Sequence, residues 1–287
     1  MNQAERKLKK ALTELLLGLD SRARIESDPI RFPKRYHEID DQELVALLSA
    51  SLSYGRVSAI GKTIESILPH LGEHPAQSAR HDALLIEAGH EAPRRFKGFV
   101  YRFTREPDLE RLWKAAGRIL LKYPHLGDCL RAHDDPSSPH LLVAYQGFYD
   151  EMIAETARFQ ESKGFHHLFS NPRRGSALKR INMWLRWLVR GPDQIDLGLW
   201  SDLGAERLII PLDVHIYKLS HALGLSTRKS ADLKTAMEIT YRLQRLAPKD
   251  PIQFDFALAH LGISGQCRGY RIEEICSYCP LKQICTL

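Results

Sequence analysis

The chain has 287 residues, a formal net charge of +6 and a pI near 9.0. Hydrophobic residues make up 44% of it and charged residues 26%, which is typical of a soluble globular protein with an ample core. No apolar run reaches the roughly eighteen residues that span a bilayer, and the N-terminal apolar patch is too short for a signal peptide. We therefore expect a cytoplasmic protein of a bacterial or archaeal cell, whose basic character permits a polyanionic partner.

Apolar residues recur at helical spacing along most of the chain, and convincing alternating strands are absent. The segments that predict helices are 4–19, 41–53, 56–71, 108–122, 139–160, 176–190, 214–223, 231–246 and 252–262. Residues 70–95 are polar and irregular, so we expect a loop or a short helix there. The predicted fold class is all-α.

Four of the five cysteines lie close to the C-terminal end of the sequence, at Cys267, Cys276, Cys279 and Cys285. A Cys-x2-Cys pair places two thiolates within reach of one metal, and two more cysteines complete a set of four sulfur ligands. Zinc and an iron–sulfur cluster both suit four thiolates, and spacing alone does not separate them. A disulfide framework is not expected in a cytoplasmic protein. The fifth cysteine, Cys129, stands alone in the sequence and is expected to be buried and inert.

The segment CSYCPLKQIC, with a proline after its Cys-x2-Cys pair, resembles the C-terminal [4Fe–4S] loop of the helix-hairpin-helix DNA glycosylases, in their endonuclease III and adenine glycosylase branch. The last three cysteines match that spacing, and the gap between Cys267 and Cys276 is longer by two residues. The resemblance implies a [4Fe–4S] cluster that positions DNA, with Zn²⁺ as the alternative. It also places Arg268 and Arg271 where such a loop meets the DNA backbone, although both are equally explained as solvated loop charges.

Residues 208–225, LIIPLDVHIYKLSHALGL, are similar to the segment that carries the catalytic aspartate of this family, and Asp213 and His215 fall on matching positions. Breaking an N-glycosidic bond builds positive charge on the sugar, which a nearby carboxylate stabilises. The resemblance thus implies that Asp213 is catalytic and that His215 orients the turn beside it. An aspartate before a helix is also a common N-cap, and that simpler role stays open.

Residues 171–195, NPRRGSALKRINMWLRWLVRGPDQI, resemble the family's hairpin, in which the pattern is Gly-x-Gly-x-Lys. Gly175 and Lys179 match the first glycine and the lysine, while Ala177 replaces the second glycine. The resemblance implies that Lys179 is the nucleophile of a lyase-competent enzyme; a plain surface lysine is the alternative. Lys179 stands 34 residues before Asp213 (213 − 179). Archaeal-type 8-oxoguanine DNA glycosylases have a similarly long connection, which favours an oxidised purine as the substrate.

Basic residues crowd the same hairpin. Backbone amides at a helix N-terminus, next to arginines, form a good phosphate site. The residues that we expect to contact DNA here are Arg173, Arg174, Gly175 and Arg180.

A weaker likeness covers residues 41–68, which resemble an early family segment whose glutamine often fills the gap left by a flipped base. Ser51 stands at the glutamine position, and Ser53 and Tyr54 are nearby alternatives. Aromatic residues that could stack on an extruded base, or simply pack in the core, are Trp184, Trp187, Phe148 and Tyr149.

Together these likenesses imply a two-lobed helix-hairpin-helix DNA glycosylase. Residues 31–199 would form one helical lobe with a degenerate hairpin. Residues 1–30 and 200–287 would form the second, which ends in the cluster loop. The expected activity is that of a monomeric base-excision-repair glycosylase and AP lyase, which acts on a lesion in double-stranded DNA. Two other classes stay open: a non-catalytic nucleic-acid-binding protein with a structural zinc or iron–sulfur site, and, less favoured, an iron–sulfur electron carrier.

Overall fold

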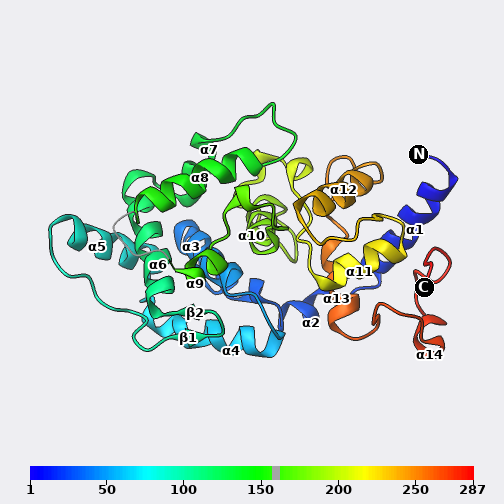
Figure 1. Cartoon of the computed structure of the whole chain (residues 1–287), viewed down its shortest axis with the longest axis horizontal. Coiled ribbons are helices and arrows are strands. Elements are labelled where there is room, and N and C mark those ends of the chain that lie inside the picture. The colour runs from blue at the N-terminus through cyan, green and yellow to red at the C-terminus, as the bar shows by residue number, and fades with distance from the viewer. Residues whose placement is uncertain (157–161) are drawn as a thin grey trace.

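The computed structural model describes residues 1–156 and 162–287 and is mostly helical, which confirms the predicted all-α class (Figure 1). The N-terminal part contains α1 (Gln3–Leu17), α2 (Ser21–Ile25), α3 (Ile39–Ser51), α4 (Val57–Ile67) and α5 (Pro75–Glu87). A short hairpin of β1 (Val100–Tyr101) and β2 (Thr104–Arg105) precedes α6 (Glu106–Lys122), α7 (Leu126–Ala132) and α8 (Leu142–Ala154). The remaining helices are α9 (Lys163–Leu168), α10 (Lys179–Val189), α11 (Val214–Ala222), α12 (Leu233–Gln244), α13 (Asp255–Ile263) and α14 (Glu273–Cys276).

Each helix predicted from apolar spacing is present, with its ends shifted by a few residues. The largest difference concerns the predicted helix 139–160, because α8 starts at Leu142 and ends at Ala154. Residues 157–160 of that prediction lie outside the described residues. None of the described helices is long and apolar enough to cross a membrane.

The expectation of a loop or short helix at 70–95 is wrong for its central part, where α5 runs from Pro75 to Glu87. The apolar spacing typical of a helix was hard to recognise in the sequence of α5, because one of its core positions is taken by a polar residue. Asp82 is fully buried and accepts a hydrogen bond from Trp113 Nε1 (2.8 Å) and two from the Arg95 guanidinium. Partners distant in sequence therefore satisfy a carboxylate that looks like a surface residue in the sequence.

The centre of the molecule is formed by α3 and α10, which pack against each other. Both are buried on most sides, so even some of their polar residues, such as Glu43 and Arg186, lie in the core. Trp184 of α10 packs between Trp200 and Phe148, with ring centroids 5.0 and 5.2 Å away. Trp187 and Tyr149 are buried as well, so the aromatic residues singled out from the sequence serve the core.

Both termini lie at the same end of the molecule, where α1, α11, α13 and α14 gather (Figure 1). There α1 packs against α13, and Glu5 of α1 forms an ion pair with Arg245 after α12 (2.5 Å). The C-terminal tail is fastened to α11 by a hydrogen bond from the Thr286 backbone N–H to the Ala222 carbonyl (2.9 Å). These contacts join the segments that we expected to share the second lobe, whereas the lobe boundaries at residues 31 and 199 stay predictions.

Candidate active site

Asp213 lies at the start of α11, immediately after the buried segment 208–212. Its Oδ1 accepts hydrogen bonds from the backbone N–H groups of His215 and Ile216, both at 2.9 Å. The carboxylate is therefore the N-cap of α11, and two amides without helical partners hold it in place. Among the described residues Oδ2 makes no hydrogen bond, so this oxygen is available to a ligand.

Lys179 is the first residue of α10 and follows an unusual backbone turn. Gly175 has φ of 71° and Leu178 has φ of 50°, in the left-handed region that a leucine enters at a cost of roughly 1–2 kcal/mol. The turn directs Lys179 toward the end of α3, where its Nζ lies 3.5 Å from the Ser53 carbonyl oxygen. Such strain persists only where the surrounding structure holds the backbone, and it is commonly found at functional sites.

Lys179 and Asp213 line the same two adjoining cavities. The larger has a volume of about 590 Å³, which lies within the range of ligand-binding clefts, and the smaller of about 80 Å³ extends toward α13. The residues shared by both walls are Ser53, Val57, Ile60, Lys179, Asp213 and Ile263. The structure thus brings together the two residues singled out as nucleophile and carboxylate, from different helices.

Behind the smaller cavity, Asp255 forms a buried ion pair that sequence reasoning missed. Its Oδ2 accepts from Arg186 at 2.8 Å, and Arg186 also contacts Asp196 at 3.2 Å. Burial raises the pKa of Asp255 to about 6 against the opposing effect of Arg186, and the charge of Asp213 raises it further. The two carboxylates therefore influence each other across the cavity wall. The only sequence signal was an aspartate at the start of an otherwise apolar helix.

One side of the larger cavity carries positive charge without carboxylates. The Arg180 guanidinium lies over the Tyr54 ring, 5.1 Å from its centroid, and donates hydrogen bonds to the carbonyl oxygens of Ser51 (3.3 Å) and His167. Burial lowers the pKa of Arg180 to about 10. Burial, followed by the charges of Arg180 and Arg102, lowers the pKa of His167 to about 4. Neither arginine forms an ion pair within the described part of the chain, so this wall favours an anionic ligand.

The β1–β2 hairpin stands beside this wall and was not predicted. The Tyr54 hydroxyl donates a hydrogen bond to the Tyr101 carbonyl (2.8 Å) and is hydrogen-bonded to the Thr104 hydroxyl (2.7 Å), which fixes the hairpin to the cavity edge. At its tip Phe103 is 60% exposed, with its ring centroid 4.9 Å from that of His167. Strands of two residues are too short to show an alternating pattern, so this exposed aromatic residue could not be predicted from the sequence.

Other predicted site residues are placed less centrally. Ser51 is buried in α3, its hydroxyl has no hydrogen-bond partner among the described residues, and it lines neither cavity, whereas Ser53 and Tyr54 do. The His215 ring packs against α13 at Gly262, where a Cβ would come within 2.5 Å of Nδ1, so His215 fixes the approach of α11 to α13.

The predicted DNA-contact residues differ in their ion pairing. Arg173 is exposed but bonded to Asp150 (2.6 and 2.7 Å), whereas Arg174 and Gly175 beside it are exposed, and Arg174 has no ion pair within the described residues. In the tail Arg268 is exposed, and Arg271 is exposed and paired with Glu273 (3.0 Å).

A family model, described as a protein of unknown function (DUF2400), matches residues 28–264, which include Lys179 and Asp213. The chain belongs to the DUF2400 family. No curated protein and no solved structure matches it.

The four tail cysteines lie beyond the DUF2400 match, in the segment that follows α13. All four are partly exposed, and burial followed by the other three thiols raises the pKa of Cys279. The Ile272 backbone N–H donates to Cys276 Sγ at 3.4 Å. No three of these sulfurs lie within 4.8 Å of one another. The other three thiols act electrostatically on Cys279, so the four lie near one another and are the candidate ligands of a metal group.

Proposed function

We propose that this DUF2400 protein is a DNA glycosylase with AP lyase activity, which removes a damaged base, foremost an oxidised purine, from duplex DNA. The observation that carries the proposal is the placement of Lys179 and Asp213 at the same two cavities. A helix N-terminus supplies each residue, so both backbones are rigid. This preorganisation suits covalent catalysis by an amine beside a carboxylate.

In the proposed reaction the neutral Lys179 amine attacks C1′ of the damaged nucleotide. The N-glycosidic bond breaks, and the base leaves with the electron pair and takes up a proton. The Asp213 carboxylate stabilises the positive charge that builds on the sugar. Ring opening then gives a Schiff base between Lys179 and C1′, and loss of the C2′ proton expels the 3′ phosphate by β-elimination.

The positive wall of the larger cavity supports a nucleic-acid substrate. Arg180 lines the larger cavity and Arg102 lies beside Gly55 of its wall, and neither has a carboxylate partner within the described residues, so the phosphates of a flipped nucleotide would meet positive charge there. Arg174, which is exposed and has no ion pair among the described residues, extends the same charge along the turn before α10, next to Gly175.

We assign to the β1–β2 hairpin the filling of the gap that a flipped base leaves, a role that the sequence resemblance gave to Ser51. An extruded base leaves a gap in the duplex that proteins commonly fill with an apolar side chain. Phe103 is exposed at the hairpin tip, while Ser51 is buried in the core. We therefore place the wedge on Phe103, with Tyr54 behind it.

The proposed ligands of a [4Fe–4S] cluster are Cys267, Cys276, Cys279 and Cys285. Four thiolates suit a [4Fe–4S] cluster or a zinc ion, and the resemblance of the tail to the cluster loop of the glycosylases favours the cluster. The cluster, when bound, would fix the tail so that Arg268 and Arg271 meet the DNA backbone; the chain's own residues perform the chemistry.

Borohydride trapping tests the proposal. Wild-type protein is expected to form a covalent adduct with duplex DNA that carries an oxidised purine or an abasic site, and Lys179→Ala is expected to lose it. Lys234→Ala, at an exposed position of α12, is the matched control and should trap normally. Trapping by Lys179→Ala would refute the assignment of the nucleophile. If the wild-type protein binds DNA but traps and cuts no lesion in a panel, the protein is a non-catalytic nucleic-acid binder.

A further inference from the structure

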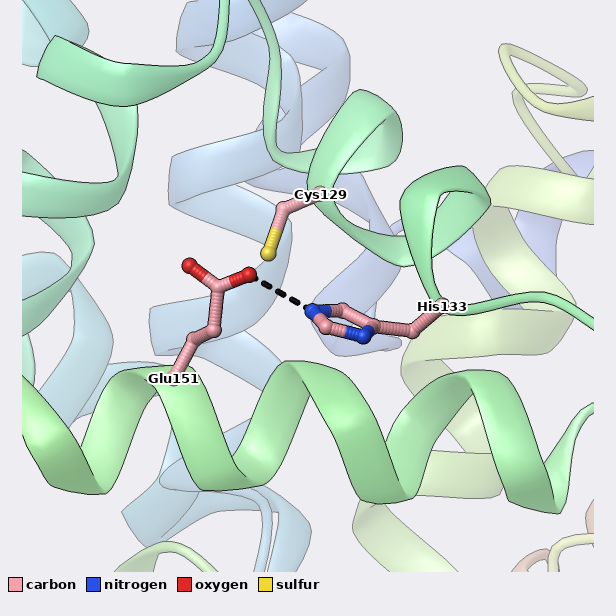
Figure 2. A group of neighbouring side chains, drawn as sticks. All are labelled: Cys129, His133 and Glu151. Carbon is pink, nitrogen blue, oxygen red and sulfur yellow. Dashed lines mark hydrogen bonds and ion pairs between the residues drawn. The ribbon is translucent and has the colours of Figure 1, made fainter.

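Cys129 does not stand alone in the folded protein. Its thiol lies together with the side chains of His133 and Glu151, and one ligand atom from each of the three lies within 4.8 Å of the others (Figure 2). Cys129 is in α7 and His133 ends that helix four residues later, so the two side chains share one face. Glu151 projects from α8, which packs against α7. None of the three lines the cavities of the candidate active site.

Neighbouring residues position the imidazole ring of His133 and the carboxylate of Glu151. Gly147 of α8 leaves the space that the His133 ring occupies, because a Cβ there would lie 2.3 Å from Cγ. His133 Nε2 is 2.6 Å from Glu151 Oε1, and the Tyr123 hydroxyl donates to the same oxygen at 2.7 Å. Such an outer hydrogen bond orients a carboxylate in the way that is common around metal ligands.

The charges that face the group come from α6 and from the C-terminal end of α8. From α6, Lys122 Nζ lies 3.9 Å from Glu151 Oε2, but its closer partner is Glu155 of α8. Glu155 is also bound by Arg118. The Cys129 thiol is fully buried beside the Glu151 carboxylate and the His133 ring.

We propose that Cys129, His133 and Glu151 bind one divalent transition-metal ion of the zinc type. Thiolate, imidazole and carboxylate are the three ligand types that zinc takes, and zinc sites with three protein ligands leave a fourth position for water. His133 is 34% exposed on its side chain, so solvent reaches this side of the site. Binding releases the thiol proton of Cys129 to solvent and leaves a thiolate–metal bond. The site is independent of the proposed glycosylase activity.

Cadmium-113 NMR of the full-length protein tests the proposal, because the chemical shift rises with the number of thiolate ligands. The metal is ¹¹³Cd²⁺ alone, added to protein whose tail site is already filled. The expected result is one saturable resonance in the range of a single thiolate, at one ion per chain. It should vanish in Cys129→Ser and persist in Lys234→Ala, which alters neither metal site. Absence of this resonance, or its survival in Cys129→Ser, would contradict the proposal. The three side chains would then form a hydrogen-bonded cluster that binds no metal.

Zinc affinity, measured by competition with a chromophoric chelator, gives a second readout that does not depend on the buried cysteine. His133→Ala changes a partly exposed side chain and is expected to weaken binding by about 100-fold or more. Tyr123→Phe keeps all three ligands and is expected to weaken it by roughly 10–100-fold. Unchanged affinity in His133→Ala would contradict the proposal, provided that circular dichroism shows a folded variant.

Discussion

Asp213 has two roles that a single substitution can separate. Its Oδ1 caps α11, while the free Oδ2 and the negative charge face the cavities. Asparagine caps a helix about as well as aspartate, but it carries no charge. The residue therefore allows a test in which helix stability and catalysis respond differently.

For Asp213→Asn we expect single-turnover base excision to slow by about 100-fold or more, since the charge that stabilises the transition state is lost. Its free energy of unfolding should change by less than about 0.5 kcal/mol, whereas Asp213→Ala should lose about 1 kcal/mol because the cap is gone. Excision rates and urea unfolding measure the two effects. Full activity of Asp213→Asn would leave Asp213 with the capping role alone.

Glu43 is a buried acid in the centre of α3. Its carboxylate accepts hydrogen bonds from the Leu126 backbone N–H (2.7 Å) and from Trp200 Nε1, yet burial outweighs both and raises its pKa to about 7. The folded protein thus keeps a proton that the unfolded chain releases near pH 4.5. Its contribution to stability is full below about pH 4.5 and is lost as the pH rises through about 7.

Between pH 5 and pH 8 the free energy of unfolding of the wild type should fall, relative to Glu43→Gln, by roughly 3 kcal/mol, because a shift of one pKa unit is worth about 1.4 kcal/mol. The variant keeps the size of the side chain and does not titrate. Urea unfolding at the two pH values measures the difference. Equal pH dependence in both proteins would show that Glu43 is already ionised at pH 5.

At the scale of elements, the β1–β2 hairpin is the least expected feature and the one nearest the cavity mouth. Phe103→Ala should slow excision of a paired lesion by roughly 5–150-fold, because base–aromatic stacking is worth about 1–3 kcal/mol. Trapping on an abasic site, where no base has to be extruded, should be less affected. Val100→Ala changes an equally exposed residue of the same hairpin and should behave as wild type. An unimpaired Phe103→Ala would exclude the hairpin as the wedge.

Helices whose apolar residues form a stripe could be predicted from the sequence, and the two residues proposed to be catalytic lie at the starts of such helices. Features that depend on partners far away in the sequence could not be predicted from it. The backbone turn before α10 directs Lys179 to Ser53, 126 residues earlier in the sequence. The direction of the Ser51 side chain follows from the packing of α3. Asp82 in α5 and the Arg186–Asp255 pair are polar groups that only the folded chain satisfies.

At the scale of the whole molecule, a net charge of +6 is small, so the local pairing of arginines decides where an anion binds. Arg173 and Arg174 are neighbours of similar exposure, but Asp150 already neutralises Arg173. Arg174→Ala should weaken DNA binding and reduce the slope of log affinity against log salt by about one. Arg173→Ala should reduce that slope by less. Equal effects of the two substitutions, measured by fluorescence anisotropy, would contradict this assignment.

The central claim is that Lys179 forms a covalent bond to DNA beside Asp213. The most direct measurement is peptide mapping by mass spectrometry of the wild-type protein after borohydride reduction on abasic-site DNA. We expect the deoxyribose adduct on Lys179. An adduct on another amine, or no adduct on any peptide, would contradict it.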